Sequence, residues 1–317
     1  MKMVWIIIAT ALIVTGCVIF AVAFAANDFN FVRLFNVEYQ TNTYEIDESF
    51  DDIVVDIDTA DVKFIPSNDG KCKVVCYENP DVTHSVTVEE GALNIKLLDT
   101  RRWYEKIGVN IGNYSISVYL PQSEYKHLKL NNSTGDVDLP DAFSFETVSI
   151  KVTTGDVACK ASCNQTLKIE SGTGNINVEG SRANELTLSV STGEIAAKNI
   201  TCGGTIGVYV STGKSELKNI KCKKLITDGT TGDISMFNVI ADESFSITRG
   251  TGEVLLSDCD AGEISVKTTT GDVKGSICSS KIFIVTTSTG KINVPESTTG
   301  GKCKISTSTG DVSIKIK

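Results

Sequence analysis

The stretch Ser133-Thr134-Gly135-Asp136-Val137 opens a series of ten Thr-Gly pairs that runs to Val312. Successive glycines of the series lie 19 or 20 residues apart, so the repeats differ in length by at most one residue. A fixed period of this length is typical of proteins in which each repeat is buried only by its neighbours in a stack. We interpret the ten glycines as structural turn residues: Gly135, Gly155, Gly174, Gly193, Gly213, Gly232, Gly252, Gly271, Gly290 and Gly310.

Apolar residues recur at fixed offsets on both sides of these glycines. The position seven residues before glycine is apolar in every repeat, the position five before it is apolar except at Thr227, and the position two after it is apolar except at Ser215. Alternation with period two is the pattern of a strand with one buried face. The sequence predicts an all-β, single-stranded β-solenoid (β-helix) of about ten 19–20-residue rungs over residues 128–317. In some repeats a return corner would carry Asn199, Asn219 or Asn238.

The residue after each glycine raises an alternative, because it is acidic in many repeats. Glycine-rich loops with carboxylates can hold cations, and backbone N–H groups can hold anions. Two repeats, however, carry Lys214 and Lys291 there, and the spacing differs from that of calcium-binding β-rolls. Glycine also adopts positive φ without steric cost, which suits a corner repeated in one sense. We therefore predict corners, with no metal site, no cofactor and no catalytic residue.

Residues 50–127 also contain strand-like stretches, but without the period. The segment 53–66 resembles a degenerate first rung, with Thr59-Ala60-Asp61 where Thr-Gly-Asp would stand, and Glu89-Glu90-Gly91 predicts a hairpin turn. We expect an N-terminal β cap that closes the solenoid core. The basic and aromatic cluster within it is either a contact loop for a carbohydrate or headgroup or an ordinary surface loop; it consists of Arg101, Arg102, Trp103 and Tyr104.

No cap follows the last repeat. Lys315 and Lys317 alternate along the final strand, a common way of discouraging edge-to-edge pairing. The C-terminal rung is therefore predicted to be open and available for self-association.

The N-terminus carries a different pattern. Residues 3–26 contain no charge, and twenty apolar residues suffice to cross a bilayer. With Lys2 on the short side, we predict a single-pass anchor over residues 1–26, a cytoplasmic N-terminus, a juxtamembrane linker over 27–49 and an extracytoplasmic body. Lipidation at Cys17, or cleavage after Ala23-Phe24-Ala25, are alternatives.

Composition excludes some function classes. A net charge of -9 gives counterion release no basic surface, so nucleic acid is not expected as a partner. The only histidines, His84 and His127, have no acid/base partner at motif spacing. The ten cysteines are predicted to be mostly reduced and structural, and Cys72 and Cys76, on one strand face, indicate zinc only weakly.

The extracytoplasmic part, from about Phe50 to Lys317, resembles a bacterial family of unknown function labelled "putative adhesins". The resemblance rests on Ile53-Val54-Val55-Asp56-Ile57, on Val118-Tyr119-Leu120-Pro121 and on the Ser-Thr-Gly-Asp-Val repeats. It implies a membrane-tethered β-solenoid at the outer face of the cell, and it supplies no ligand.

Three functions remain open from sequence alone. The first is non-enzymatic display or adhesion on a surface polymer or protein, because a regular ladder presents rows of side chains at fixed spacing and suits avidity. The second is a structural or sensory scaffold that contacts another envelope membrane protein. A polysaccharide-active β-helix enzyme is a remote third, since no long loop interrupts the repeats to build an acid/base pair.

Overall fold

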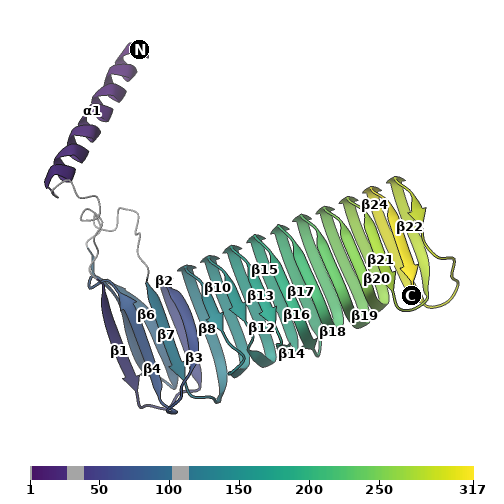
Figure 1. Ribbon diagram of the computed structural model, residues 1–317, viewed down its shortest axis with the longest axis horizontal. Helices are drawn as coiled ribbons and strands as arrows, with labels where there is room; N and C mark the ends of the chain where they lie inside the picture. The colour runs from purple at the N-terminus through teal and green to yellow at the C-terminus, as the bar shows by residue number, and fades with distance from the viewer. Residues whose placement is uncertain (1, 27–38, 102–113) are drawn as a thin grey trace.

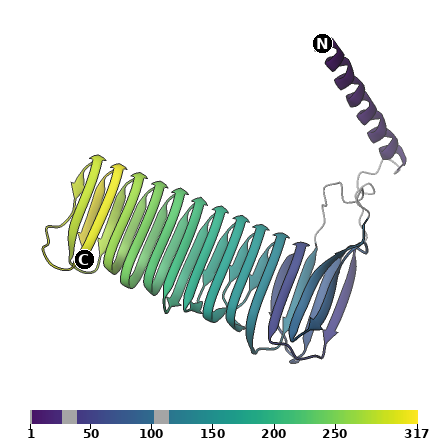
Figure 2. The same ribbon diagram turned by 180° about the vertical axis from the view of Figure 1, so that it is seen from behind.

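The computed structural model describes residues 2–26, 39–101 and 114–317. Its body is a stack of β-rungs (Figures 1 and 2). The strands before the repeats are β1 (Gln40–Ile46), β2 (Asp52–Thr59), β3 (Asp61–Pro66), β4 (Cys72–Glu78), β5 (Val82–Glu89), β6 (Ala92–Asp99) and β7 (Ser115–Leu120).

The first repeats contain β8 (Glu124–Thr134), β9 (Val137–Leu139), β10 (Ser144–Thr154), β11 (Val157–Cys159), β12 (Ser162–Thr173), β13 (Ile176–Glu179), β14 (Arg182–Ala183), β15 (Glu185–Thr192), β16 (Ile195–Cys202) and β17 (Thr205–Thr212). The later ones contain β18 (Ser215–Thr231), β19 (Ile234–Thr251), β20 (Val254–Thr270), β21 (Val273–Ile277), β22 (Lys281–Thr289), β23 (Ile292–Asn293), β24 (Gly301–Thr309) and β25 (Val312–Ile316).

The predicted solenoid is confirmed by the pairing of equivalent positions. Strand β10 lies parallel to β8 and β12, with Val148 opposite Leu128 on one side and Leu167 on the other. These inward residues are at most 1% exposed, so each rung is buried by its two neighbours. The return corner is also where the sequence places it, since Asn199, Asn219 and Asn238 all have positive φ, and Asp258 continues the row.

Two features of the corners, the backbone φ and the close stacking of neighbouring rungs, favour glycine. Nine of the ten have φ between 123° and 149°, which disfavours any residue with a Cβ. The corners are also stacked so closely that a Cβ on Gly213 would lie 1.8 Å from the carbonyl oxygen of Gly193. Gly290 differs, because its φ is outside this region although a Cβ there would still meet the oxygen of Gly310 at 2.0 Å. Close stacking, which the sequence did not reveal, is thus the more general reason for glycine.

The acidic residues after the glycines belong to the backbone ladder. The backbone N–H of Asp156 donates to Asp136 Oδ1 at 2.8 Å, and that of Asn175 donates to Asp156 Oδ1 at 2.7 Å. The same bond runs from Glu194 to Asn175 and from Glu253 to Asp233. These side chains cap the corners by accepting a hydrogen bond from a backbone N–H of the next rung, which agrees with their interpretation as turn residues.

The C-terminal rung is not the end of the stack, contrary to the prediction. Strand β24 pairs with β20 on one side and with β22 on the other, and β25 lies between β21 and β23. In Figure 1 the yellow β24 accordingly lies inside the yellow-green β22. The rung of Lys281–Asn293, hereafter the open rung, is therefore terminal, and the chain turns back through residues 294–300 to insert its last strands beneath it.

The N-terminal end is also threaded out of sequence order. Strands β2 and β3 form the degenerate rung expected from Thr59-Ala60-Asp61, because Thr59 is opposite Thr134 and the N–H of Asp136 donates to Asp61 Oδ1. Outside this rung lie β6 and β7, and then β5 and β4, which pair antiparallel with them. Strand β1 adds to β4, so part of the predicted linker 27–49 belongs to the cap.

Helix α1 (Lys2–Ala26) confirms the predicted N-terminal helix. Its window Trp5–Val22 has a mean hydropathy of 2.6 and none of it is buried in the protein, so its length and composition allow it to cross a membrane. A signal sequence would share these properties.

Candidate functional site

The outward faces of the rungs are mostly polar, but apolar side chains interrupt them in places. Lys218 on β18 lies opposite Phe237 on β19, and Leu255 on β20 lies diagonally from Phe237, opposite Ser235. These three outward side chains, of Lys218, Phe237 and Leu255, form what we call the central patch. Phe237 is 47% exposed and Leu255 38%, and Lys218 Nζ lies 5.5 Å from the centroid of the Phe237 ring. A shallow groove of about 260 Å³ runs along these side chains.

A second apolar pair lies on the strand that precedes the corner. Tyr209 is 39% exposed and Ile226 37%. The ring of Tyr209 covers Gly207, since a Cβ there would lie 2.8 Å from the ring. Gly207 in turn is opposite Ile226 on the next strand. The two apolar groups belong to different strand segments of the rungs, so they do not form one binding surface.

The predicted contact loop is described only at its first residue. Arg101 donates through Nε and Nη2 to the two carboxylate oxygens of Asp99, each at 3.0 Å. This bidentate pair and the neighbouring charges raise the pKa of Arg101. Arg102, Trp103 and Tyr104 lie outside the described residues.

The open rung exposes both a strand edge and part of the core. Among the pairings of the described strands, β22 pairs only with β24 and β23 only with β25. Phe283 and Val285 take the inward positions of this rung but are only half-buried, and Ile292 is 49% exposed. In the open rung, apolar side chains at positions that are buried in the interior rungs are thus partly in contact with water.

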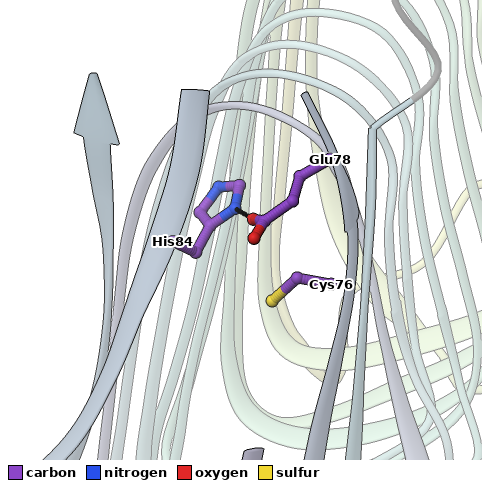
Figure 3. A group of neighbouring side chains, drawn as sticks. All are labelled: Cys76, Glu78 and His84. Atoms are coloured by element: carbon purple, nitrogen blue, oxygen red, sulfur yellow. Dashed lines mark hydrogen bonds and ion pairs between the residues drawn. The ribbon is translucent and has the colours of Figure 1, made fainter. Parts of the chain in front are cut away.

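Inside the N-terminal cap, three metal-ligating side chains meet. Cys76, Glu78 and His84 offer ligand atoms that all lie within 4.8 Å of one another, and we call this group the cap cluster (Figure 3). Cys76 and Glu78 are two residues apart on the buried face of β4, and His84 comes from β5. All three are at most 2% exposed.

Hydrogen bonds hold the cap cluster in place. His84 Nδ1 lies 2.6 Å from Glu78 Oε2, and Asn42 Nδ2 donates to Glu78 Oε1, also at 2.6 Å. Tyr44 Oη donates to the backbone oxygen of His84. Burial and the nearby Glu78 raise the pKa of Cys76 to about 12, and burial and the charge of Glu78 also raise that of Tyr44.

The sequence reasoning missed this cluster although part of the signal was present. Cys72, Val74 and Cys76 alternate inward, and continuing the alternation by one step buries Glu78. A carboxylate on the buried face of a strand needs a partner, which is the available sequence-level clue. That His84 is the partner could not be read from motif spacing, because the short turn after Glu78 places it on the next strand.

Ser215 and Thr227 interrupt the apolar inward rows, and a third buried polar residue, Arg249, is hydrogen-bonded to Ser215. Arg249 is 1% exposed, occupies an inward position opposite Gly229, and donates through Nη2 to Ser215 Oγ at 2.9 Å. A Cβ on Gly229 would lie 1.6 Å from Arg249 Nη1, so glycine makes room for the guanidinium. Burial lowers the pKa of Arg249, while Asp228 and Asp233 oppose that shift. The Oγ1 of Thr227, the other exception, is buried on the same strand face.

The cysteines of the body are separate thiols. Every cysteine is unpaired, and within the body Cys278 alone is exposed. Cys278, which is 19 residues after Cys259 in the sequence, does not lie opposite it, because Ile277 occupies that position after a register shift near Gly275. Burial raises the pKa of Cys159, Cys163, Cys222, Cys259 and Cys303 to about 12. Such thiols are poor nucleophiles.

Comparison with known proteins identifies the repeat. The family model described as Toastrack DUF4097 matches residues 50–208 and 204–317. No curated protein matches the chain. Among solved structures, a putative lipid binding protein from Parabacteroides distasonis is 21% identical with a TM-score of 0.50, covering 74% of this chain and 96% of its own.

Two other solved structures are related at lower similarity. A putative adhesin from Parabacteroides distasonis is 14% identical with a TM-score of 0.45, over 86% of this chain and 98% of its own. A putative adhesin from Bacteroides fragilis is 15% identical with a TM-score of 0.41, over 88% of this chain and 97% of its own.

Proposed function

Because this chain belongs to the Toastrack DUF4097 family, we propose that it is a non-enzymatic envelope protein that displays a β-solenoid for contact with a surface polymer. Helix α1 serves as a retained anchor, with Lys2 and the α-amino group in the cytoplasm and the solenoid outside. Two solved structures that are similar to this chain are named putative adhesins. Those names are consistent with this role but supply no ligand.

The central patch is the observation that carries the proposal. The Phe237 ring, the Lys218 ammonium group and the Leu255 side chain lie on three successive rungs, and strands of neighbouring rungs are about 4.8 Å apart. A polymer lying along the stack would meet polar rows on both sides of the patch. Aromatic rings bind the apolar faces of sugar rings, so a glycan strand is the ligand class that this surface fits best.

A binding measurement with matched variants tests this function. The full-length protein in detergent would be incubated with insoluble cell-wall glycan, and the bound fraction would be determined after sedimentation. We expect Phe237→Ala to lower binding at least fivefold. Ile226→Ala, which removes a comparably exposed apolar side chain elsewhere, should leave it unchanged. Absence of binding by the unmodified protein, or equal binding by both variants, would reject the central patch as the site.

A scaffold function is the second candidate, and the open rung favours it. The free edge of β22 and β23, together with the half-buried Phe283 and Val285, can accept an added strand through backbone hydrogen bonds and apolar contacts. A photo-crosslinking residue at Ile284 should then capture one stoichiometric membrane partner or a second copy of the chain in cells. The same residue at Ile226 should capture neither; equal capture at both positions would speak against the scaffold.

A polysaccharide-active enzyme remains the remote alternative and gains no support from the corners. Asp136 and Asp156 accept backbone N–H groups of the next rung. Their carboxylates therefore hold the corners of neighbouring rungs together, as turn residues do.

A further inference from the structure

The geometry of the cap cluster points to a zinc site: we propose that Cys76, Glu78 and His84 bind one Zn²⁺ ion that closes the N-terminal end of the solenoid core. The inference does not rest on the proposed display function, because the cluster lies in the cap and the central patch lies on later rungs.

The donor set is the first argument. A thiolate, an imidazole nitrogen and a carboxylate oxygen are the three ligand types that Zn²⁺ uses in proteins, with bond lengths of about 2.0–2.3 Å. A tetrahedral ion with these bonds holds its ligand atoms about 3.3–3.7 Å apart. The ligand atoms of the cluster lie within 4.8 Å of one another, and the closest pair, His84 Nδ1 and Glu78 Oε2, is 2.6 Å apart. Binding therefore requires the separations between ligand atoms to change by about 1 Å.

Charge is the second argument. Glu78 is fully buried, and a buried carboxylate is costly unless a positive group compensates it. Asn42 supplies a hydrogen bond but no charge, and among the described residues the ion-pair partner of Glu78 is His84, which compensates the carboxylate only when its imidazole is protonated. A divalent ion with one carboxylate, one thiolate and a neutral imidazole would make the site neutral. Binding would release the thiol proton of Cys76 to solvent.

The surrounding contacts are those of a site whose ligands are held in position. Asn42 holds the second oxygen of the Glu78 carboxylate, and Tyr44 holds the backbone of His84. Groups that orient metal ligands in this way strengthen binding. The ligands also come from β4 and β5, so an ion would join two strands that are packed at the outer end of the cap. Three protein ligands leave the fourth position for a water molecule.

Metal analysis of the full-length protein tests the site. The reduced protein in detergent would be stripped with a chelator, exposed to Zn²⁺ and desalted, and its zinc content would be measured. We expect one equivalent of zinc per chain, at least tenfold weaker binding in Cys76→Ser and His84→Gln, and unchanged binding in Cys72→Ser. Cys72 is the matched control, because it is a buried cysteine on the same face of the same strand but outside the cluster.

Co²⁺ substitution provides a second readout, and its first part uses only the unmodified protein. A thiolate-to-cobalt charge-transfer band in the unmodified protein, and its loss in Cys76→Ser, would support the site. The inference is overturned if the unmodified protein retains less than one tenth of an equivalent of zinc. It is also overturned if Cys76→Ser and His84→Gln retain as much as the unmodified protein, since the ion would then lie elsewhere, for example on the exposed Cys278.

Discussion

The two ends of the solenoid terminate the same repeat in different ways. At the N-terminal end, antiparallel strands β1, β4 and β5 cover the core, and Glu78 there is hydrogen-bonded to both His84 and Asn42. At the C-terminal end the open rung has no covering strand among the described residues, and Phe283 and Val285 stay half-buried. Each rung inside the stack is buried by the rungs on either side, but a terminal rung lacks one of these neighbours. Its exposed core can therefore be covered only by non-repetitive sequence.

The largest difference between the ends should appear on truncating an aromatic side chain. Phe64, in the rung next to the cap, is 1% exposed, whereas Phe283 is only partly buried. We expect Phe64→Ala to lower the free energy of unfolding by about 3–5 kcal/mol and Phe283→Ala by about 1–2 kcal/mol, because less apolar area and a smaller cavity are involved. Urea denaturation followed by circular dichroism measures both; equal losses would contradict the open end.

Adding a side chain at a corner should distinguish the ends in a similar way. Gly135→Val meets both positive φ and the carbonyl of Ala60, 2.2 Å from the added Cβ. The expected loss is about 2–4 kcal/mol from backbone strain and overpacking. In Gly290→Val the added Cβ would lie 2.0 Å from the carbonyl oxygen of Gly310. The φ of Gly290 is, however, outside the strained region, and its rung can shift outward. We expect at most half the loss, measured by thermal unfolding, and a larger loss at Gly290 would show that the terminal rung is held rigidly.

The exposed edge should govern self-association. If the open rung pairs with a second copy, Ile284→Lys should weaken dimerisation at least fivefold, because a charge on an edge strand opposes pairing. Its free energy of unfolding should change by less than about 0.5 kcal/mol, since Ile284 is 46% exposed. Sedimentation equilibrium of the detergent-solubilised protein gives the dimer constant, with Ile226→Lys as the control. A strictly monomeric unmodified protein would exclude this use of the edge.

The smallest effect concerns the ion pair that ties the chain end to the return corner. Lys317 Nζ donates to Asp258 Oδ2 at 2.8 Å, and this bond and that of Ser276 Oγ lower the pKa of Asp258. The stabilisation is therefore present above the ordinary pKa of an aspartate and is lost as the pH falls through the lowered value. Lys317→Gln should move the Asp258 pKa upward in an NMR titration, and an unchanged pKa would show that Ser276 alone sets it.

The fold was predictable because its signal is local. Apolar residues at fixed offsets from each glycine, as at Leu225 and Ile234, specify the buried face of every rung. Positive φ was likewise foreseeable for glycine, while the 1.8 Å approach of a Gly213 Cβ to the neighbouring corner was not. Ser215 and Thr227 were visible as exceptions, but Arg249, which bonds to Ser215, lies 34 residues away in the sequence.

The candidate sites depended on contacts between strands. His84 and Glu78 are near in sequence, yet only the packing of β5 beside β4 brings Nδ1 to 2.6 Å from the carboxylate. The central patch required knowing that Phe237 and Leu255 face outward on adjacent rungs. Neither relation has a fixed spacing that a sequence search could recognise.

The sequence by itself determined the rung, its corners and the apolar N-terminal helix, because all three follow from short-range periodicity and composition. Only the tertiary structure decided the order in which the rungs stack. The β24–β25 rung lies inside the β22–β23 rung, and the β2–β3 rung lies inside strands that follow it in sequence. Most rungs present nearly the same inward pattern, so that pattern alone does not specify which rung lies beside which; the order depends on the connecting segments and on the packing at the ends.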